Sequence, residues 1–568
     1  MWNNLFPPLI WIKGYSSRNL GNDAIAGITL AAYAIPVSMA YASLAGLPVQ
    51  YGIYGYLIGG LFYSFFGTGR QLAVGPTSAI SLLIGTTIAT MANGDIQRWG
   101  EIASLTALVM GLMSLLAYFL RLNSIINFIS ESVLMGFKAG AAITIALTQL
   151  PKLFGIRGGG SAFFERADFL LRQLPETNLT VLIFGLTTII LLITGEKLFP
   201  GRPSAIILVI VSIVLITFTS LNNSGFSLVG VMPAGLPQFH LPSISIKDLD
   251  GVIPLAFACF LLAYIESVAA AKTMANQGGY EINSRQELLA LAAANTATAL
   301  GHGYPVSGGL SQSAVNSTAG AKTTLSLVFA SAAIALCLLF LTGTLKNLPD
   351  VMLTSILLVA ISGLVDIKGL KRLWKVSWVE FTIAMLALSG VIVFGILKGV
   401  ILAAIASIVL LLRAVADPHI AFLGRIPGTK RYTDYNRHPD NELIPGLLIF
   451  RVEASLFYFN VENIRNHVWA EVLRTENSLK CVIWDFSTSP YVDIAGARLI
   501  KKLYLDLKAK GIAFRLAEAH SEVRDLLRIE EIEHLLGHIS RKISVDDLVI
   551  ESTNEVQSIV PTEPETKS

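Results

Sequence analysis

The sequence predicts a polytopic α-helical membrane protein followed by a smaller α/β domain. Apolar residues make up 53% of the 568 residues and charged residues 14%, whereas about a quarter of an average soluble domain is charged. Residues 204–221 and 325–344 contain no ionisable side chain. At ~1.5 Å per helical residue, such runs approach or match the ~30 Å hydrocarbon core of a bilayer. Composition and segment length therefore exclude an ordinary soluble protein.

Other features of the composition exclude further classes of function. The net charge of +3 is too small to indicate a nucleic-acid partner, and three cysteines are too few for a disulfide framework. The sequence contains no recognisable nucleophile–base pair, metal-ligand cluster or phosphate-binding loop. We therefore expect no enzymatic activity, no metal site, no cofactor and no nucleic-acid partner.

Apolar runs of roughly twenty residues predict about fourteen membrane crossings. Splitting the chain after the seventh crossing gives two sets of seven, and an odd number per set forces opposite orientations. The predicted architecture is therefore a seven-plus-seven inverted repeat. An N-terminal cytoplasmic or interfacial segment, residues 1–23, precedes a membrane domain at 24–416. The expected crossings are 24–44, 48–66, 72–91, 103–120, 124–149, 178–196, 204–221, 253–272, 286–301, 306–321, 325–345, 350–366, 378–397 and 398–413.

The distribution of positive charge predicts the orientation in the membrane. Lysine and arginine concentrate in the loops on one side, including Arg70, Arg121 and the cluster at 368–375. Because positive residues are retained on the cytoplasmic side, both termini are predicted to be cytoplasmic in a multi-pass plasma-membrane protein. The basic residues of the long segment 151–177 disagree, but that segment also carries acids.

Two predicted crossings are interrupted at corresponding places in the two halves. Extended residues 71–74 and then Gly75-Pro76 precede a helix in the third crossing, and extended residues 304–307 precede a helix near Leu310 in the tenth. Lipid tolerates non-helical backbone only where protein or a watery cavity satisfies its polar groups. Paired interruptions of this kind are the best sequence indication of a transporter's binding site.

The opposite orientation of the two halves brings both helix N-termini together at mid-membrane. Their partial positive charges form an anion site that needs no buried cation, and Thr77 and Ser78 add hydroxyl groups beside free N–H groups. The alternative for each break alone is a simple kink at Pro76 and a simple helix cap at Ser311.

Glu266 places a carboxylate deep in the eighth predicted crossing. A charge at that depth costs a few kcal/mol and faces the protein interior or water. A carboxyl group removed from water retains a proton more readily, so Glu266 can carry one. The alternative is a structural carboxylate satisfied by neighbours such as Ser267. Lys138 also lies in an apolar run. Extension of its side chain to the membrane interface accounts for a lysine at this position as well as a functional role does.

Several motifs occur in order along the chain and resemble those of the sulfate permease (SulP) anion transporters, in particular bacterial members. Two lie close together, LPVQYGIY at 47–54 and FGTGR at 66–70. The others are GPT at 75–77, GFKAG at 136–140 and AGAKT at 319–323. The resemblance covers nearly the whole chain and implies a seven-plus-seven fold in the bacterial inner membrane. In that fold a core domain (crossings 1–4 and 8–11) moves against a gate domain (5–7 and 12–14).

The resemblance also implies a substrate site between the third and tenth half-helices. Carried over by position, the substrate-binding residues are Tyr41, Thr77, Ser78, Ser311 and Gln312, and Glu266 is the proton-coupling residue. Gln312 occupies a position where some animal relatives have arginine. Sodium-coupled bicarbonate relatives pair an acidic residue with a hydroxyl one turn later, whereas Ala270 stands there in this chain. A proton is therefore favoured over sodium.

The C-terminal part resembles a STAS domain, a fold shared with anti-sigma-factor antagonists. Strands at Leu447–Val452, 481–486 and 512–516 and helices at 495–510 and 522–529 predict an α/β domain over 443–550. A linker at 417–442 precedes it, and residues 551–568 are expected to be disordered. VIWDFS at 482–487 and YVDIAG at 491–496 match the switch region of the fold, but Ile494 and Ala495 replace its two serines. Phosphorylation there is not supported, and Asp493 is interpreted as a helix cap.

Together these features predict a secondary active transporter of small anions. Sulfate is the favoured substrate, carried by proton symport with elevator-type alternating access in a homodimer. The alternatives in the same family are a sodium-coupled bicarbonate transporter, a proton-coupled dicarboxylate transporter and a passive channel or exchanger. A membrane-tethered signalling protein that works through its STAS domain is the alternative from another class.

Overall fold

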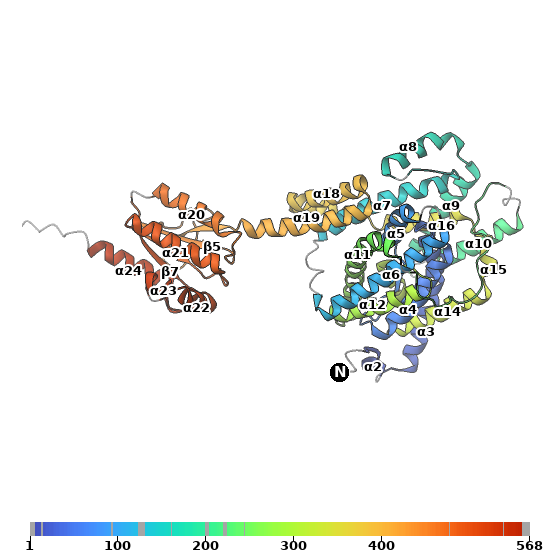
Figure 1. Ribbon diagram of the computed structural model, residues 1–568, viewed down its shortest axis with the longest axis horizontal. Coiled ribbons are helices and arrows are strands. Elements are labelled where there is room, and N and C mark those ends of the chain that lie inside the picture. The colour runs from blue at the N-terminus through green and yellow to red at the C-terminus, as the bar shows by residue number, and fades with distance from the viewer. Residues whose placement is uncertain are drawn as a thin grey trace, which may run out of the picture. The chain divides into compact units, whose positions relative to one another are not determined.

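The protein forms two compact units, Met1–Ser407 and Ile408–Ser568 (Figure 1). The first is helical apart from two very short strands, and the second is built on a five-stranded sheet. The computed structural model describes residues 6–12, 15–92, 95–122, 131–160, 162–198, 204–219, 224–243, 245–475, 478–537 and 539–558.

The first half of the helical unit contains one of the two interrupted segments. Its elements are α2 (Pro8–Trp11), α3 (Ser17–Leu44), α4 (Val49–Phe66), β1 (Val74–Gly75), α5 (Ser78–Met91), α6 (Ile96–Phe119), α7 (Glu131–Phe154), α8 (Phe163–Gln173), the 3-10 turn Leu174–Glu176, α9 (Leu179–Leu198) and α10 (Ser204–Phe218).

The second half contains the matching interrupted segment. Its elements are α11 (Ile246–Gly278), α12 (Ser284–Leu300), β2 (Ser307–Gly308), α13 (Leu310–Thr318), α14 (Leu325–Phe340), α15 (Thr342–Leu345), α16 (Asp350–Ser362), α17 (Ile367–Val376), α18 (Trp378–Phe394) and α19 (Ile396–Ala416), the last of which continues into the second unit.

Every predicted crossing contains a helix, but the number of crossings stays a prediction. By length and hydropathy alone, the described residues include five helices able to span a membrane. There are six if the bent pair Phe163–Glu176 and Leu179–Gly195 forms one span. Several other apolar helices are shorter, among them α5, whose extended lead-in shortens it.

Helices from the two halves pack against each other. Helix α3 contacts α14, α6 contacts α12, and α7 contacts α18. Strands β1 and β2 pair antiparallel, with Val74 opposite Gly308 and Gly75 opposite Ser307. The interrupted segments therefore meet directly, as the inverted-repeat hypothesis requires.

The predicted N-terminal segment 1–23 differs from the structure at its end. Helix α3 begins at Ser17, with the Ser16 side chain accepting a hydrogen bond from the Asn19 N–H, and Asp23 is fully buried. Asp23 accepts hydrogen bonds from the backbone N–H groups of Lys322 and Thr323 at 2.6 and 3.1 Å. The predicted segment ends too late because the sequence gives no sign that the charged Asp23 is bonded to residues far along the chain.

We expect Gly136→Ala to destabilise the helical unit by about 1–3 kcal/mol, the usual range for overpacking. A methyl group at Gly136 in α7 would overlap the backbone carbonyl of Ala384 in α18, which cannot move aside as a side chain does. The measurement is the thermal unfolding midpoint of the purified protein in detergent, followed by tryptophan fluorescence.

Gly390→Ala provides the matched control on α18. Apart from its chain neighbours and the backbone of its own helix, no atom of the described residues lies within 4 Å of the position its methyl group would take. Because glycine costs ~0.5–1 kcal/mol relative to alanine within a helix, this change should leave the midpoint unchanged or raise it. Equal midpoints for the two variants would contradict the close α7–α18 packing.

The second unit is an α/β domain whose sheet has the order β4-β3-β5-β6-β7. The parallel strands β5 (Leu447–Val452), β6 (Cys481–Asp485) and β7 (Ala513–Ala517) match the three predicted strands within one residue. Helices α20 (Val461–Thr475), α21 (Ile494–Ala509), α22 (Ser521–Ile529) and α23 (Glu533–Leu536) cover one face, and α24 (Val545–Ser558) packs on the other. Asp493 caps α21, accepting a hydrogen bond from the Gly496 N–H at 2.8 Å as expected.

Two predicted boundaries of this unit are wrong. The segment 417–442 is not a linker, because β3 (Ile420–Arg425) and β4 (Tyr432–Asp434) belong to the sheet and pair antiparallel. Ala421 and Leu423 are buried in its core, a short alternation hidden among charged residues. Residues 551–558 are helical rather than disordered, since α24 is anchored upstream by Leu548 and Val549. Residues 559–568 lie outside the described residues.

Candidate functional site

The paired strands β1 and β2 bring the beginnings of two helices together inside the helical unit. Helix α5 starts directly after β1, with Thr77 at its N-cap, and α13 starts after β2, with Gly309 at its N-cap. The Gly309 N–H extends the pairing by donating to the Ala73 carbonyl at 3.1 Å. Two sets of unsatisfied helix N–H groups therefore flank one space, and their dipoles favour negative charge there.

All six residues expected at the site line a single cavity of about 170 Å³. By this measure a single water needs only ~10–15 Å³, whereas drug-sized ligands occupy pockets of ~300–1,000 Å³. The size therefore suits a small ion with some of its hydration water. The expected residues in the wall are Tyr41, Thr77, Ser78, Glu266, Ser311 and Gln312.

Glu266 is the acidic group in the wall and contacts both interrupted segments. Its Oε2 accepts hydrogen bonds from the Thr77 hydroxyl at 3.3 Å and the Ser307 hydroxyl at 3.4 Å. The two hydroxyls are themselves 3.2 Å apart. On the next residue, the Ser267 hydroxyl accepts a hydrogen bond from the Gly308 N–H at 2.7 Å. Helix α11 thus holds the carboxylate at the junction of the two half-helices.

Gln312 connects the two segments from the other side. Its buried side-chain amide donates from Nε2 to the Pro76 carbonyl at 2.9 Å. Its Oε1 is also buried, and no hydrogen-bond partner for it lies within the described parts of the chain. Ser311, one residue earlier, is exposed to the cavity. A substrate or water that donates a hydrogen bond would satisfy the free oxygen of Gln312.

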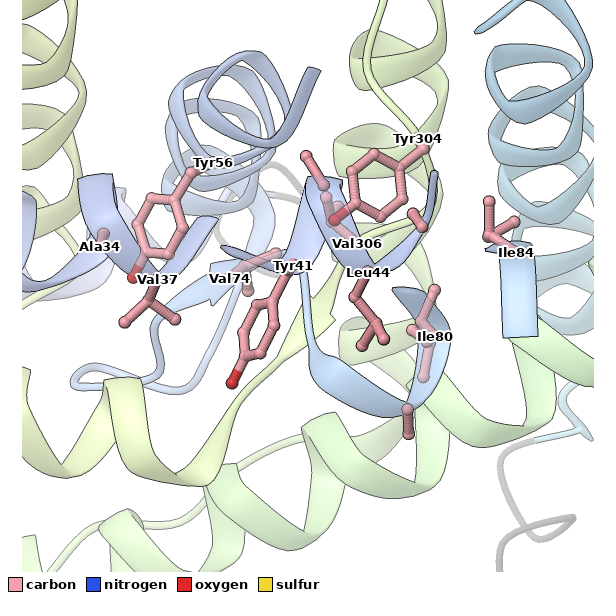
Figure 2. Packing of buried hydrophobic residues seen from close by; sticks show 14 of the residues in the cluster. Ala34, Val37, Tyr41, Leu44, Tyr56, Val74, Ile80, Ile84, Tyr304 and Val306 are labelled. Atoms are coloured by element: carbon pink, nitrogen blue, oxygen red, sulfur yellow. The ribbon is translucent and has the colours of Figure 1, made fainter. Parts of the chain in front are cut away.

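An apolar cluster supports the site and fixes the extended segments. Tyr41, Val74, Tyr304 and Val306 belong to it, and the Tyr41 hydroxyl points away from Tyr304 and Val306 (Figure 2). Tyr304 also shares a 2.9 Å hydrogen bond with the Ser81 hydroxyl. Rigid packing on this side leaves the helix N-termini and hydroxyls as the polar face of the cavity.

The cavity also contains residues that the sequence interpretation left aside. Lys138 lines the cavity and interacts electrostatically with Glu266. From the sequence, extension of this side chain to the membrane interface had accounted for Lys138 as well as a functional role. Ala360, Gly363 and Leu364, in α16 and directly after it, complete the wall opposite the half-helices. The sequence offers no periodic signal for these contacts, because they come from separate helices.

The buried carboxylate of Glu287 in α12 was missed and explains one of the sequence motifs. It accepts hydrogen bonds from the Tyr63 hydroxyl at 2.7 Å and the Thr68 N–H at 2.8 Å, and others from the Thr68 hydroxyl and the Gly69 N–H. Glu287 does not line the cavity. It fixes the turn before β1, so the FGTGR motif serves to position the half-helix.

With this geometry described, comparison with known proteins identifies the family. The model of the sulfate permease family matches residues 20–387, and that of the STAS domain matches residues 438–545. The chain belongs to the sulfate permease family. The predicted STAS domain is thereby confirmed, and the sulfate permease match covers both interrupted segments.

Curated relatives of this sulfate permease family member cover almost the whole chain. A probable sulfate transporter of Mycobacterium tuberculosis is 30% identical over 94% of this chain and 95% of its own length. Probable sulfate transporter 4.2 of Arabidopsis thaliana is 32% identical over 96% of this chain and 83% of its own length.

Solved structures show the same fold at lower identity. Murine Slc26a9, an anion transporter in the inward-facing state, aligns with a TM-score of 0.88 at 22% identity, covering 97% of this chain and 94% of the other. The transmembrane domain of the cyanobacterial bicarbonate transporter BicA aligns with a TM-score of 0.60 at 21% identity, covering 69% of this chain and 98% of the other. This sulfate permease family member is a multi-pass membrane protein that transports anions.

Proposed function

We propose that this chain accumulates sulfate by proton symport and that the cavity between α5 and α13 is its substrate site. The observation that carries the proposal is the meeting of two helix N-termini around a wall containing Thr77, Ser311 and Glu266. Several relatives are named as sulfate transporters, which supports sulfate as the substrate.

Proton coupling rests on the surroundings of Glu266. Its carboxylate accepts hydrogen bonds from two hydroxyl groups and shares the cavity wall with Lys138, in a cavity sized for a small anion. A protonated Glu266 brings no repelling charge near a bound anion, whereas the ionised form does. Anion binding and proton binding should therefore favour each other, which is the requirement for symport.

The proposal of elevator-type movement is supported by the helices that line the cavity. Tyr41, Glu266 and the half-helices belong to the expected core set, whereas Lys138 of α7 and Ala360 of α16 belong to the expected gate set. An anion held between these sets is carried across when one set moves as a body against the other. The homodimer expected from the resemblance stays a prediction.

The test is uptake of radiolabelled sulfate into proteoliposomes with an imposed inward proton or sodium gradient. We expect sulfate to accumulate above equilibrium with the proton gradient alone and to lose this accumulation when a protonophore is added. Bicarbonate and fumarate are added as unlabelled competitors to rank the substrates.

Other outcomes would replace the proposal with a named alternative. Accumulation that follows sodium and ignores pH indicates a sodium-coupled transporter, with bicarbonate as the leading substrate. Uptake that only equilibrates sulfate under every gradient indicates a passive channel or exchanger. Efficient competition by fumarate with weak sulfate uptake indicates a dicarboxylate carrier.

A further inference from the structure

A cluster of three potential metal ligands lies away from the cavity. Glu101 is near the start of α6, His240 lies between α10 and α11, and His302 follows the end of α12. One possible ligand atom from each lies within 4.8 Å of the other two, and all three residues are partly buried. None of the three lines the cavity between the half-helices.

The side chains are already arranged as a set. His240 Nε2 is 3.0 Å from Glu101 Oε1, and the two imidazole rings stack with centroids 3.7 Å apart and an interplanar angle of 16°. Two ligands of a tetrahedral zinc ion, each at ~2.0–2.1 Å from the metal, are about 3.4 Å apart. The nitrogen lone pairs of stacked rings lie in nearly parallel planes, so at least one imidazole must rotate out of the stack for both to bind one ion.

Surrounding contacts hold each member in place. Glu101 Oε2 accepts a hydrogen bond from the Ser243 N–H at 2.8 Å, which leaves Oε1 facing His240. The backbone N–H of His240 donates to the Leu300 carbonyl at 2.9 Å, and the rings of Tyr51 and His302 pack edge to face with centroids 6.3 Å apart. Outer contacts of this kind orient the ligands of metal sites.

The buried Nδ1 of His240 has no hydrogen-bond partner among the residues that the structure describes. A buried polar nitrogen of this kind calls for a ligand or a water molecule. His302 has a φ of 55° because it is the left-handed residue that ends α12, where the Gly303 N–H donates to the Thr298 carbonyl at 2.9 Å.

We propose that Glu101, His240 and His302 form a binding site for Zn²⁺. Two imidazoles and one carboxylate are a ligand set that zinc prefers, and three protein ligands leave a fourth position for water. Calcium and magnesium are disfavoured because they require six or more ligands that are nearly all oxygen.

The site would join segments that are remote in sequence. His240 lies in the stretch between α10 and α11, whose upstream part is hydrogen-bonded to the segment before α16. There the Val229 N–H donates to the Leu348 carbonyl at 2.9 Å, and the Gly230 N–H donates to the Lys346 carbonyl at 3.1 Å. Zinc would fix the other end of this stretch to α6 and to the end of α12. With the predicted topology, the ion arrives from outside the cell.

The experiment is a titration of the purified, chelator-treated full chain with ZnCl₂, followed by competition with a fluorescent zinc indicator. We expect saturable binding of one zinc per chain. Loss of a residue that hydrogen-bonds to a metal ligand typically weakens metal affinity ~10–100-fold, so loss of a ligand in His302→Ala or Glu101→Gln should weaken it at least that much. Cobalt added in place of zinc should give the visible absorption of a tetrahedral site, which His302→Ala abolishes.

His467→Ala is the matched control, because this exposed histidine of α20 bonds only to the Asn463 carbonyl of its own helix among the described contacts. It should bind zinc as the unmodified chain does. Size-exclusion elution and the thermal midpoint without metal verify that each variant is folded. Absence of saturable zinc binding to the unmodified chain, or equal affinities of His302→Ala and His467→Ala, would overturn the proposal.

Discussion

We expect Ser311→Trp to reduce sulfate uptake to the level of protein-free vesicles. Ser311 lies in the first turn of α13 and is exposed to the cavity of about 170 Å³. An indole ring there fills the space next to the helix N-terminus and excludes an anion from its N–H groups. Uptake into proteoliposomes and binding of labelled sulfate to the purified protein measure the effect.

Two further variants separate the filling of the cavity from damage to the fold. Thr318→Trp places the same ring at the exposed end of the same helix, outside the cavity wall, and should retain uptake. Ser311→Ala removes the hydroxyl but leaves the space open, so it should weaken binding without abolishing it. Uptake by folded Ser311→Trp at the unmodified rate would refute the site assignment.

The second large effect is expected for Glu266→Gln. The amide approximates the shape of the protonated carboxyl group and retains an acceptor for the Thr77 and Ser307 hydroxyls. It cannot gain or lose a proton, so accumulation driven by an inward proton gradient should disappear. Exchange of labelled sulfate for unlabelled sulfate should continue, because anion binding itself needs no titration.

Glu281→Gln is the control for the loss of a carboxylate, since Glu281 is exposed and lies beyond the end of α11. It should accumulate sulfate as the unmodified chain does. Proton-driven accumulation by the Glu266→Gln protein would contradict the coupling role. The rates are compared at equal amounts of folded, reconstituted protein.

Much of the candidate site was predictable because each part has a local signal. Gly75-Pro76 and the extended residues 304–307 break apolar runs, and Glu266 is conspicuous within an apolar stretch. The hypothesis that the two breaks meet also required the opposite orientation of the two halves. The pairing of Gly75 with Ser307 agrees with that hypothesis. Whether the cavity binds and carries an anion awaits the experiments above.

The boundaries were less predictable than the elements. Strand β5 was located at both ends from its continuous apolar run, whereas β3 and β4 were mistaken for a linker. Strand β4 has only three residues, and β3 lies in a segment rich in charged residues, so neither carries a continuous apolar run. Both are stabilised by pairing with neighbouring strands. Tertiary context decided their conformation.

The sequence alone determined the class of protein, the positions of its apolar helices, the paired breaks and the α/β character of the C-terminal unit. These are local properties, since hydrophobic periodicity and turn residues act over a few turns of chain. Only the tertiary structure decided which polar groups meet. Glu287 reaches Thr68 across 219 positions and His240 reaches Glu101 across 139, and no local pattern encodes such contacts. Burial strongly favours a hydrogen-bond partner for each polar group, but packing of the whole unit determines which partner is within reach.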